Sequence, residues 1–447
     1  MPKKKTALTI EERLQQALVP AEEQPYEVPE NWVWVRLGAI AEIVTGGTPS
    51  KKHPEYYGGN FPFYKPSDLD QGRLTYDASE YLSEEGKKVS RIIPKNSTAV
   101  CCIGSIGKCG YLMCEGTTNQ QINSAIPKIN SLCLYYYLCT ENFVQNLLSM
   151  ASATTIAIVN KSKMESCAFP LPPLSEQQRI VERIEELFAK LDEAKERLQE
   201  VADSFAVRKA AILHKAFTGE LTQQWRCENG VSDESWEEKK FSEVAVIKSN
   251  LVSPFDYLDY PHIAPDSIEK FTGRLLSYRT IREDNVKSPK HLFYKGQILY
   301  SKIRPYLSKA IIADVDGLCS ADMYPIEALC NTKYLLKYML STEFLEQSTT
   351  AGSRSLLPKI NQKELSSISV PLPTLPEQHE IVRLIDDLLA RERKAQQAAE
   401  QALASIDLMK KSILARAFRG ELRGELGTNK ASEASALELL KQVLAEN

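Results

Sequence analysis

Two stretches of the chain place apolar residues at alternating spacings of four and three. In the first stretch the positions are Ile180, Ile184, Leu187, Leu191, Ala194, Leu198, Val201 and Phe205. In the second they are Ile381, Ile385, Leu388, Glu392, Ala395, Ala399, Ala402 and Ile406. This spacing is typical of a coiled-coil seam rather than of one amphipathic helix on a globular core. We therefore predict two antiparallel helices, each of roughly 40 residues and about 60 Å.

The two helical stretches are copies of one another. Residues 169–221 recur as residues 370–422 without an insertion or deletion, at an offset of 370 − 169 = 201. Capping boxes are expected to begin the helices at Ser175 and Thr374, and glycines to end them at Gly219 and Gly420. A repeat interrupted by a longer, different segment predicts a pseudo-symmetric molecule with two variable lobes on a shared frame.

The lobes between the repeats contain short strands and helices. Residues 98–103 and 297–300 are strand-like, whereas residues 134–148 and 334–345 have a helical period. The lobes are distantly related, since Trp32, Leu37, Phe143 and Asn160 have counterparts in Trp236, Phe241, Phe344 and Asn361. The predicted fold class is α+β, with two pseudo-symmetric α/β lobes joined by an antiparallel coiled coil of two long helices.

The pattern divides the chain into six segments. A helical arm (1–28) precedes the first lobe (29–168) and the first helical repeat (169–221). The second lobe (222–369), the second repeat (370–423) and a helical tail (424–447) follow, with a tail helix expected at residues 436–445. A chain of 447 residues exceeds one compact core, so more than one domain is expected.

Composition restricts the kind of protein. Hydrophobic residues make up 43% and charged residues 25%, and no apolar run could span a bilayer, so we expect a cytoplasmic protein without membrane segments. The ten cysteines lack zinc spacing and are expected to be reduced thiols. The net charge of −3 argues mildly against nucleic acid, but residues 270–309 contain ten Lys or Arg against two acids.

The order of motifs resembles one known family. A Pro-Leu-Pro-x-Leu-x-Glu-Gln helix ending in Ala-Phe-x-Gly-Glu-Leu occurs twice, and the first lobe begins with Pro29-Glu-Asn-Trp32, Thr45-Gly-Gly-Thr-Pro-Ser50 and Phe61-Pro-Phe-Tyr-Lys-Pro-Ser-Asp68. Nearly the whole chain resembles the specificity subunit of Type I restriction-modification systems. Order, spacing and duplication all agree with that family.

The resemblance implies a DNA reader without chemistry of its own. Each lobe would be a target recognition domain that reads one half of an asymmetric, split target in double-stranded DNA. The helices would set the spacer and dock two methyltransferase (M) subunits, alongside restriction/translocase (R) subunits of the complex. S-adenosylmethionine, ATP and Mg²⁺ are implied for these partners, whereas no cofactor, metal site or catalytic residue is expected in this chain. Half-sites would lie roughly 34 Å apart, one turn of DNA.

Candidate DNA contacts are polar and basic residues of both lobes. Arginine matches guanine O6/N7 and Asn or Gln matches adenine N6/N7, while lysine suits phosphate. The candidates are Thr48, Ser50, Lys51, Lys65, Lys108, Asn119, Gln120 and Gln121 in the first lobe, and Arg274, Arg279, Lys302, Arg304, Tyr306 and Lys309 in the second.

Three other interpretations remain open. Asp68, Glu85 and Lys87 form a loose nuclease pattern whose carboxylates would bind Mg²⁺. Residues 104–109 resemble a phosphate loop weakly, because Cys102 replaces the first glycine. A third interpretation is a structural coiled-coil adaptor, which the charge concentrated in the lobes disfavours. Tyr135-Tyr-Tyr137 could stack on bases, but its leucine neighbours favour packing.

Overall fold

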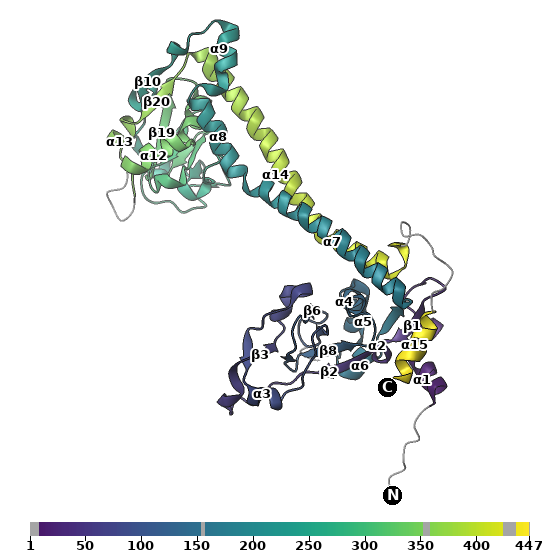
Figure 1. The fold of residues 1–447 in the computed structure, drawn as a ribbon. Coiled ribbons are helices and arrows are strands. Elements are labelled where there is room, and N and C mark those ends of the chain that lie inside the picture. Colours follow the sequence, from purple (N-terminus) through teal and green to yellow (C-terminus); the bar gives the residue numbers. More distant parts are fainter. Residues whose placement is uncertain (1–8, 153–156, 352–357, 423–434, 447) are drawn as a thin grey trace. The chain divides into compact units, whose positions relative to one another are not determined.

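The computed structural model describes residues 9–152, 157–351, 358–422 and 435–446. The chain forms two compact units, which are described separately. Unit 1 combines Met1–Arg197 with Ala402–Asn447, and unit 2 is the uninterrupted stretch Leu198–Gln401. Each unit contains one lobe and parts of both long helices (Figure 1). Among the described residues, no helix is long and apolar enough to cross a membrane.

The first lobe is built on a four-stranded antiparallel sheet. Its strands β2 (Ala41–Thr45), β8 (Ile122–Pro127), β5 (Thr98–Cys101) and β6 (Cys109–Tyr111) lie in that order. A smaller sheet has the order β4 (Glu80–Leu82), β3 (Tyr57–Tyr64), β7 (Thr117–Thr118), and β1 (Val33–Arg36) pairs with β9 (Ala168–Leu171). The apolar face of the main sheet lies in the principal core of unit 1 with Ile43, Val100 and Ala125.

The second lobe repeats the main sheet in the same order. Here the strands are β11 (Ala245–Ile247), β19 (Met323–Ala328), β16 (Ile298–Ser301) and β17 (Ala310–Ile312), all antiparallel. β10 (Glu237–Lys240) pairs with β20 (Ser369–Leu372) as β1 does with β9. The second sheet differs, because it has five strands: β12 (Leu251–Val252), β15 (Lys290–Phe293), β18 (Gly317–Cys319), β13 (Pro261–Ile263) and β14 (Arg279–Thr280). The α+β class with two related lobes is confirmed.

Each lobe closes with three helices at equivalent positions. They are α4 (Ser131–Leu138), α5 (Glu141–Met150) and α6 (Lys161–Glu165) in unit 1, and α11 (Thr332–Met339), α12 (Thr342–Ala351) and α13 (Gln362–Ser366) in unit 2. The helical period predicted over 134–148 and 334–345 is confirmed, but it did not reveal that each stretch is interrupted. Each is two helices, and the Thr140 side chain caps α5 by accepting from the Phe143 N–H.

The residues matched between the lobes have equivalent roles. Leu37 and Phe241 begin the short helices α2 (Leu37–Ile40) and α10 (Phe241–Val244), and both are buried. The Asn160 and Asn361 side chains cap α6 and α13, each accepting a backbone N–H at 2.9 Å. The distant similarity of the sequences therefore reflects one backbone frame used twice.

The duplicated segments form the long helices. The first copy is α7 (Leu174–Asp203) followed by α8 (Phe205–Phe217), with a break at Ser204, and the second is α14 (Leu375–Phe418). In unit 1 the end of α14 packs on the start of α7, since Leu414 and Phe418 share a core with Ile180 and Ile184. Farther along, Lys410 Nζ lies 2.6 Å from Asp192 Oδ1. In unit 2 the start of α14 packs on α8 through the core shared by Ile381, Ile385, Leu213 and Phe217. Both pairings are antiparallel, as predicted.

Burial along the predicted seam is uneven, and in the second copy Ala399 and Ile406 are buried as well as the first positions. Ile180, Ile184, Ile381 and Ile385 are buried, whereas Val201 is 38% exposed. The capping boxes were predicted wrongly. α7 begins at Leu174, so Ser175 lies inside the helix. The Glu377 carboxylate accepts from Thr222 and Arg226 instead of forming a capping box with Thr374. Gly219 (φ 81°) and Gly420 (φ 76°) do follow the helix ends in the left-handed region.

The ends of the chain complete unit 1. α1 (Ile10–Ala17) and α15 (Ala436–Ala445) lie side by side, and each begins with a capping box (Figure 1). Leu440 and Leu444 of α15 join the core that contains Trp34 and Leu37. The tail helix therefore has the predicted bounds and covers lobe 1.

The Glu-Gln pair of the repeated motif attaches each long helix to its lobe. The Trp32 indole N–H donates to Glu176, and the Trp236 indole N–H donates to Glu377. Gln177 and Gln378, the residues that follow, both accept from a backbone N–H of their lobe and donate to a proline carbonyl. The same contacts in both copies explain why the motif occurs twice.

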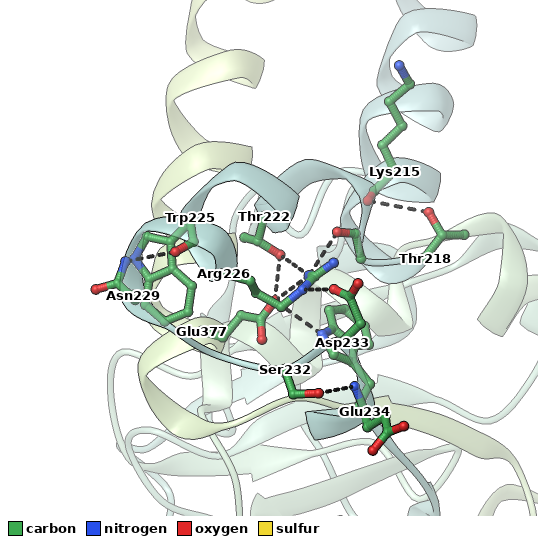
Figure 2. A network of polar contacts seen from close by, with 12 residues as sticks. Lys215, Thr218, Thr222, Trp225, Arg226, Asn229, Ser232, Asp233, Glu234 and Glu377 are labelled. Atoms are coloured by element: carbon green, nitrogen blue, oxygen red, sulfur yellow. Dashed lines mark hydrogen bonds and ion pairs between the residues drawn. The ribbon is translucent and has the colours of Figure 1, made fainter.

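Unit 2 adds a buried ion pair at this attachment. Arg226 of α9 (Gln223–Asn229) donates to Glu377 at 2.7 Å, and Thr222 donates to the same oxygen at 2.6 Å (Figure 2). Arg226 also pairs with Asp233 at 2.7 Å. The side chain of Glu377 is fully buried and that of Arg226 is 8% exposed. The segment that follows α8 is thereby fixed to the beginning of α14.

Candidate nucleic-acid interface

In each lobe, one edge of the main sheet carries two adjoining turns. In lobe 1, β5 ends and β8 begins at this edge, because Cys101 is paired with Ile122. The Cys102 N–H donates to the Gln121 carbonyl at 2.7 Å and joins the β5–β6 hairpin to the turn at residues 119–121. In lobe 2, Ser301 is paired with Met323 in the same way. Each lobe therefore carries loops at this edge, on the same arrangement of strands.

The loop at residues 45–50 lies against the 119–121 turn in lobe 1. The Gly47 N–H donates to the Thr118 carbonyl at 2.8 Å. A Cβ on Gly46 would lie 2.2 Å from the Asn119 carbonyl oxygen, so only glycine permits this approach. The Thr48 hydroxyl can then donate to Gln120 Oε1 at 2.5 Å.

The predicted residues of this turn divide into buried and exposed members. Asn119 is buried and pairs with the side chain and backbone of Gln121 at 3.0 Å. Thr48, Ser50, Lys51 and Gln120 are exposed. Asn119 therefore holds the turn in shape, while Gln120 presents its amide to solvent.

Two predicted phosphate contacts of lobe 1 are already paired. Lys65 Nζ lies 2.8 Å from Glu80, and Lys108 Nζ lies 2.7 Å from Asp70. Both lysines remain partly exposed. Each would have to exchange a carboxylate for a phosphate in order to bind DNA, which reduces its net contribution.

In lobe 2, four predicted residues lie on the β16–β17 hairpin. Lys302 lies over the Tyr324 ring at 5.2 Å, and Lys309 donates to the Pro265 carbonyl at 2.7 Å. Arg304 and Tyr306 are exposed at the tip. Within the described part of the chain, no hydrogen bond or ion pair engages the Arg304 guanidinium. The hairpin thus presents an unengaged guanidinium next to an exposed phenol.

Arg274 and Arg279 lie on other segments and are both exposed. Arg274 follows Phe271, whose backbone N–H donates to the Ser308 carbonyl of the hairpin at 3.3 Å. Arg279 lies on β14, at the edge of the five-stranded sheet. The structure therefore brings the loop with Arg274 to the hairpin and leaves Arg279 on a different sheet.

Burial lowers the pKa of two groups near this surface. Burial lowers the pKa of His291, and the charge of Lys302 lowers it further. Burial lowers the pKa of Lys209, an α8 lysine that donates to the Phe271 carbonyl. His291 is consequently neutral at pH 7, so the positive charge of this region comes from lysine and arginine.

The sequence missed a set of exposed aromatic residues on lobe 2. Their spacing among Lys and Arg at residues 251–294 was a signal for nucleic acid that could have been used. They are Phe255, Tyr260, Phe271 and Tyr294, exposed by 39% to 63%, and the exposed Tyr278 lies in the same stretch.

The nuclease pattern is not assembled as a metal site. Asp68 is buried and accepts the backbone N–H groups of Lys65 and Ser79. Glu85 pairs with Lys88, and Lys87 with Glu115. No cluster of three or more His, Cys, Asp or Glu that could hold a metal occurs among the described residues. The geometry therefore gives this interpretation no support.

Two other patterns also have structural explanations. Residues 104–108 form the turn between β5 and β6, and no helix follows to complete a phosphate loop. Tyr135, Tyr136 and Tyr137 are buried, and Tyr137 packs edge-on against Phe169 and Phe418. The three tyrosines pack inside unit 1, as the leucines around them predicted. All ten cysteines are free.

Comparison with known proteins identifies the frame. The family model of the Type I restriction modification DNA specificity domain matches residues 29–203 and 233–401. The chain belongs to this family. Each match takes in one lobe and most of the long helix that follows it, so the family's domain is the unit that this chain contains twice.

Relatives of the specificity-domain family match almost the whole chain. The chain is 40% identical to the specificity subunit of the Type I restriction enzyme EcoDI from Escherichia coli, over 94% of this chain and 96% of the relative. It is 26% identical to the EcoBI specificity subunit of the same species, over 94% and 93%. The HsdS subunit from Thermoanaerobacter tengcongensis has the same fold, with a TM-score of 0.63 at 18% identity over 89% of this chain and 99% of that one.

Proposed function

We propose that this chain is the DNA sequence-recognition subunit of a Type I restriction-modification complex. One observation carries the proposal: a single sheet frame occurs twice, is followed each time by a copy of the duplicated helix motif, and displays different side chains on equivalent turns. Each lobe reads one half of a split target in double-stranded DNA. Because the displayed side chains differ, the two halves have different sequences.

The helices supply the spacer and the docking sites for partners. Val207 of α8 and Leu408 of α14 stand at equivalent positions, since 408 − 207 = 201, and they are 71% and 66% exposed. Leu174 and Leu375 are a second such pair, at 55% and 54%. Exposed apolar side chains at repeated positions fit two copies of one partner. We assign them to two methyltransferase subunits.

The chemistry belongs to the partners. Methyltransferase subunits would bring S-adenosylmethionine, and restriction/translocase subunits would use ATP and Mg²⁺, while the chain itself selects the site in the cytoplasm. A methylated adenine in each half would have to be flipped into the partner's pocket, at a cost of a few kcal/mol.

Methylation mapping tests the proposal. The chain is combined with its methyltransferase and S-adenosylmethionine on genomic DNA lacking modification, and modified adenines are located by sequencing. The expected result is one asymmetric, two-part motif with a fixed spacer, and methyltransferase without this chain should give no such motif. Methylation without sequence preference would contradict the proposal. Mg²⁺-dependent cutting by the chain alone, abolished in Glu85→Ala, would instead favour a nuclease.

A further inference from the structure

The turns at this edge of the sheet have the same backbone arrangement in both lobes. Their exposed side chains differ, because the polar side chain stands on a different turn in each lobe. In lobe 1, the Gln121 N–H donates to the Asn119 side chain, and in lobe 2 the Asp322 N–H donates to the Ser320 side chain. Between these residues stand Gln120 in lobe 1 and Ala321 in lobe 2. The same turn therefore carries a hydrogen-bonding amide in one lobe and a methyl group in the other.

The adjoining hairpin shows the opposite distribution. Cys101 and Ser301 each donate their side chain to the carbonyl two residues on, at Ile103 and Ile303, so the hairpins begin alike. The next residue is Gly104 in lobe 1 and Arg304 in lobe 2. The hairpin therefore displays a guanidinium only in lobe 2, and no long side chain at that position in lobe 1.

The backbone of Arg304 lies in the left-handed region, which is unfavourable for arginine. Its φ is 49°, and Gly104 at the equivalent position has a φ of 80°. This region is strained for residues other than glycine, and such strain often accompanies function. The backbone N–H of Arg304 donates to the Pro358 carbonyl at 2.8 Å, which holds the turn. An arginine stands where glycine would fit more easily, and its side chain is exposed.

The side chain of Gln120 is positioned by a hydrogen bond. Its Oε1 accepts the Thr48 hydroxyl at 2.5 Å and keeps one lone pair, while its amide N–H groups have no partner among the described residues. An amide in this state can pair with adenine through N6 and N7. The guanidinium of Arg304 can likewise donate to guanine O6 and N7.

We propose that the lobes read their half-sites from different turns of the shared frame: Gln120, positioned by Thr48, reads an adenine in one half, and Arg304 reads a guanine in the other. The inference deepens the proposed function and rests on it. It reduces the fourteen candidate contacts of the sequence to two reading residues and one positioning residue.

Selection from a DNA library tests the inference. Complexes of the full chain with its methyltransferase select from duplexes carrying two randomised blocks at variable spacing, and the enriched sequences are read. In Arg304→Gly, the preference for guanine at one position of one half should fall about 5- to 150-fold. Gln120→Ala should remove an adenine preference in the other half only, and Thr48→Val should weaken that same preference to a smaller extent.

The controls separate reading from folding. Arg304→Gly should unfold at the same temperature as the wild type or higher, because glycine relieves the left-handed conformation. Ser308→Gly is the matched control, since Ser308 has φ 45° in the same hairpin but is 2% exposed and cannot reach DNA. It should leave both halves of the motif unchanged. Arg304→Lys keeps the charge and should weaken the guanine preference less than Arg304→Gly does, because an ammonium can still donate to guanine but lacks the fixed fork of the guanidinium.

The possible failures are distinguishable. A wild-type complex that enriches no motif would overturn the proposed function and this inference with it. A wild-type complex that enriches a two-part motif, together with Arg304→Gly and Gln120→Ala complexes that enrich the same motif, would overturn the inference alone. Loss of preference in both halves at once, or a lower unfolding temperature in Arg304→Gly, would also overturn it by indicating a structural role.

Discussion

At the scale of single residues, Glu377 has the most demanding environment in unit 2. Its carboxylate is fully buried, and one oxygen accepts from Thr222, Arg226 and Trp236 (Figure 2). A buried carboxylate is tolerated only if it is paired and hydrogen-bonded. Arg226 is the charged partner, so it determines whether α14 can begin where it does.

Arg226→Met should destabilise unit 2 by about 3–5 kcal/mol, because it leaves the Glu377 charge buried without a partner. Adding Glu377→Gln should recover part of that loss, since the amide carries no charge. Hydrogen exchange measured by mass spectrometry reports the stability of unit 2 separately from that of unit 1. Asp233→Asn is the control and should cost no more than about 1 kcal/mol, since the Asp233 side chain is 78% exposed. Strictly additive losses in the double variant would contradict this account.

His291 makes unit 2 sensitive to mild acid. Burial and Lys302 hold the pKa of His291 below its ordinary 6.5, so the unfolded chain binds a proton that the folded chain does not. Stability is therefore present above pH 6.5 and decreases as the pH falls toward the lowered pKa, by up to about 1.4 kcal/mol per pH unit. Urea unfolding at pH 7.5 and 5.5 should show a smaller difference for His291→Gln than for the wild type. An equal difference would exclude this role.

At the scale of elements, the two copies of the long helix differ at one pair of equivalent positions. Glu392 is the only polar residue at a predicted seam position of the second copy, and its carboxylate accepts from Arg208 of α8 at 2.5 Å. The residues at equivalent positions in unit 1 are Leu191 and Met409, an apolar pair. A polar pair within an apolar seam fixes which residues face each other.

Arg208→Met alone should destabilise unit 2 by about 1 kcal/mol, because the Glu392 side chain is only 26% exposed and loses its partner. Arg208→Met with Glu392→Leu imports the residues of unit 1 and should restore or exceed the original stability. Thermal unfolding monitored by circular dichroism compares the variants. The account is wrong if the double variant is less stable than the single one.

The elements also show what a single sequence can and cannot reveal. The seam and the glycines at 219 and 420 were predictable, because periodicity and backbone preference are local properties. The break between α4 and α5 was missed, since apolar spacing continues across Thr140 and hides its capping role. Asn119 and Gln120 are adjacent polar residues, and only packing against distant segments buries one and exposes the other.

At the scale of the whole molecule, the repeat gives each unit the same exposed apolar position. Val207 lies in unit 2 and Leu408 in unit 1. If one methyltransferase subunit docks at each of these two positions, a charged substitution at one position should remove one subunit and leave the other bound.

Val207→Glu and Leu408→Glu should each reduce the bound methyltransferase from two subunits to one, and the double variant should bind none. Docking would bury the introduced carboxylate without a charged partner, and the loss of its hydration opposes binding. Native mass spectrometry counts the subunits. Ser412→Glu, at an exposed neutral position on α14, is the charge-matched control and should retain both. Two bound subunits in the double variant would place the docking surface elsewhere.

The cores of the two units can be completed at different stages of translation, because unit 2 is one stretch of the chain and unit 1 is two. Unit 2 is one uninterrupted stretch, so its core can close once residue 401 has left the ribosome. Unit 1 has to wait, because Phe418, Leu440 and Leu444 belong to the core that contains Tyr137 and Phe169. Lobe 1 is therefore synthesised first and finished last, and in the interval its open core is the part of the nascent chain most in need of chaperones.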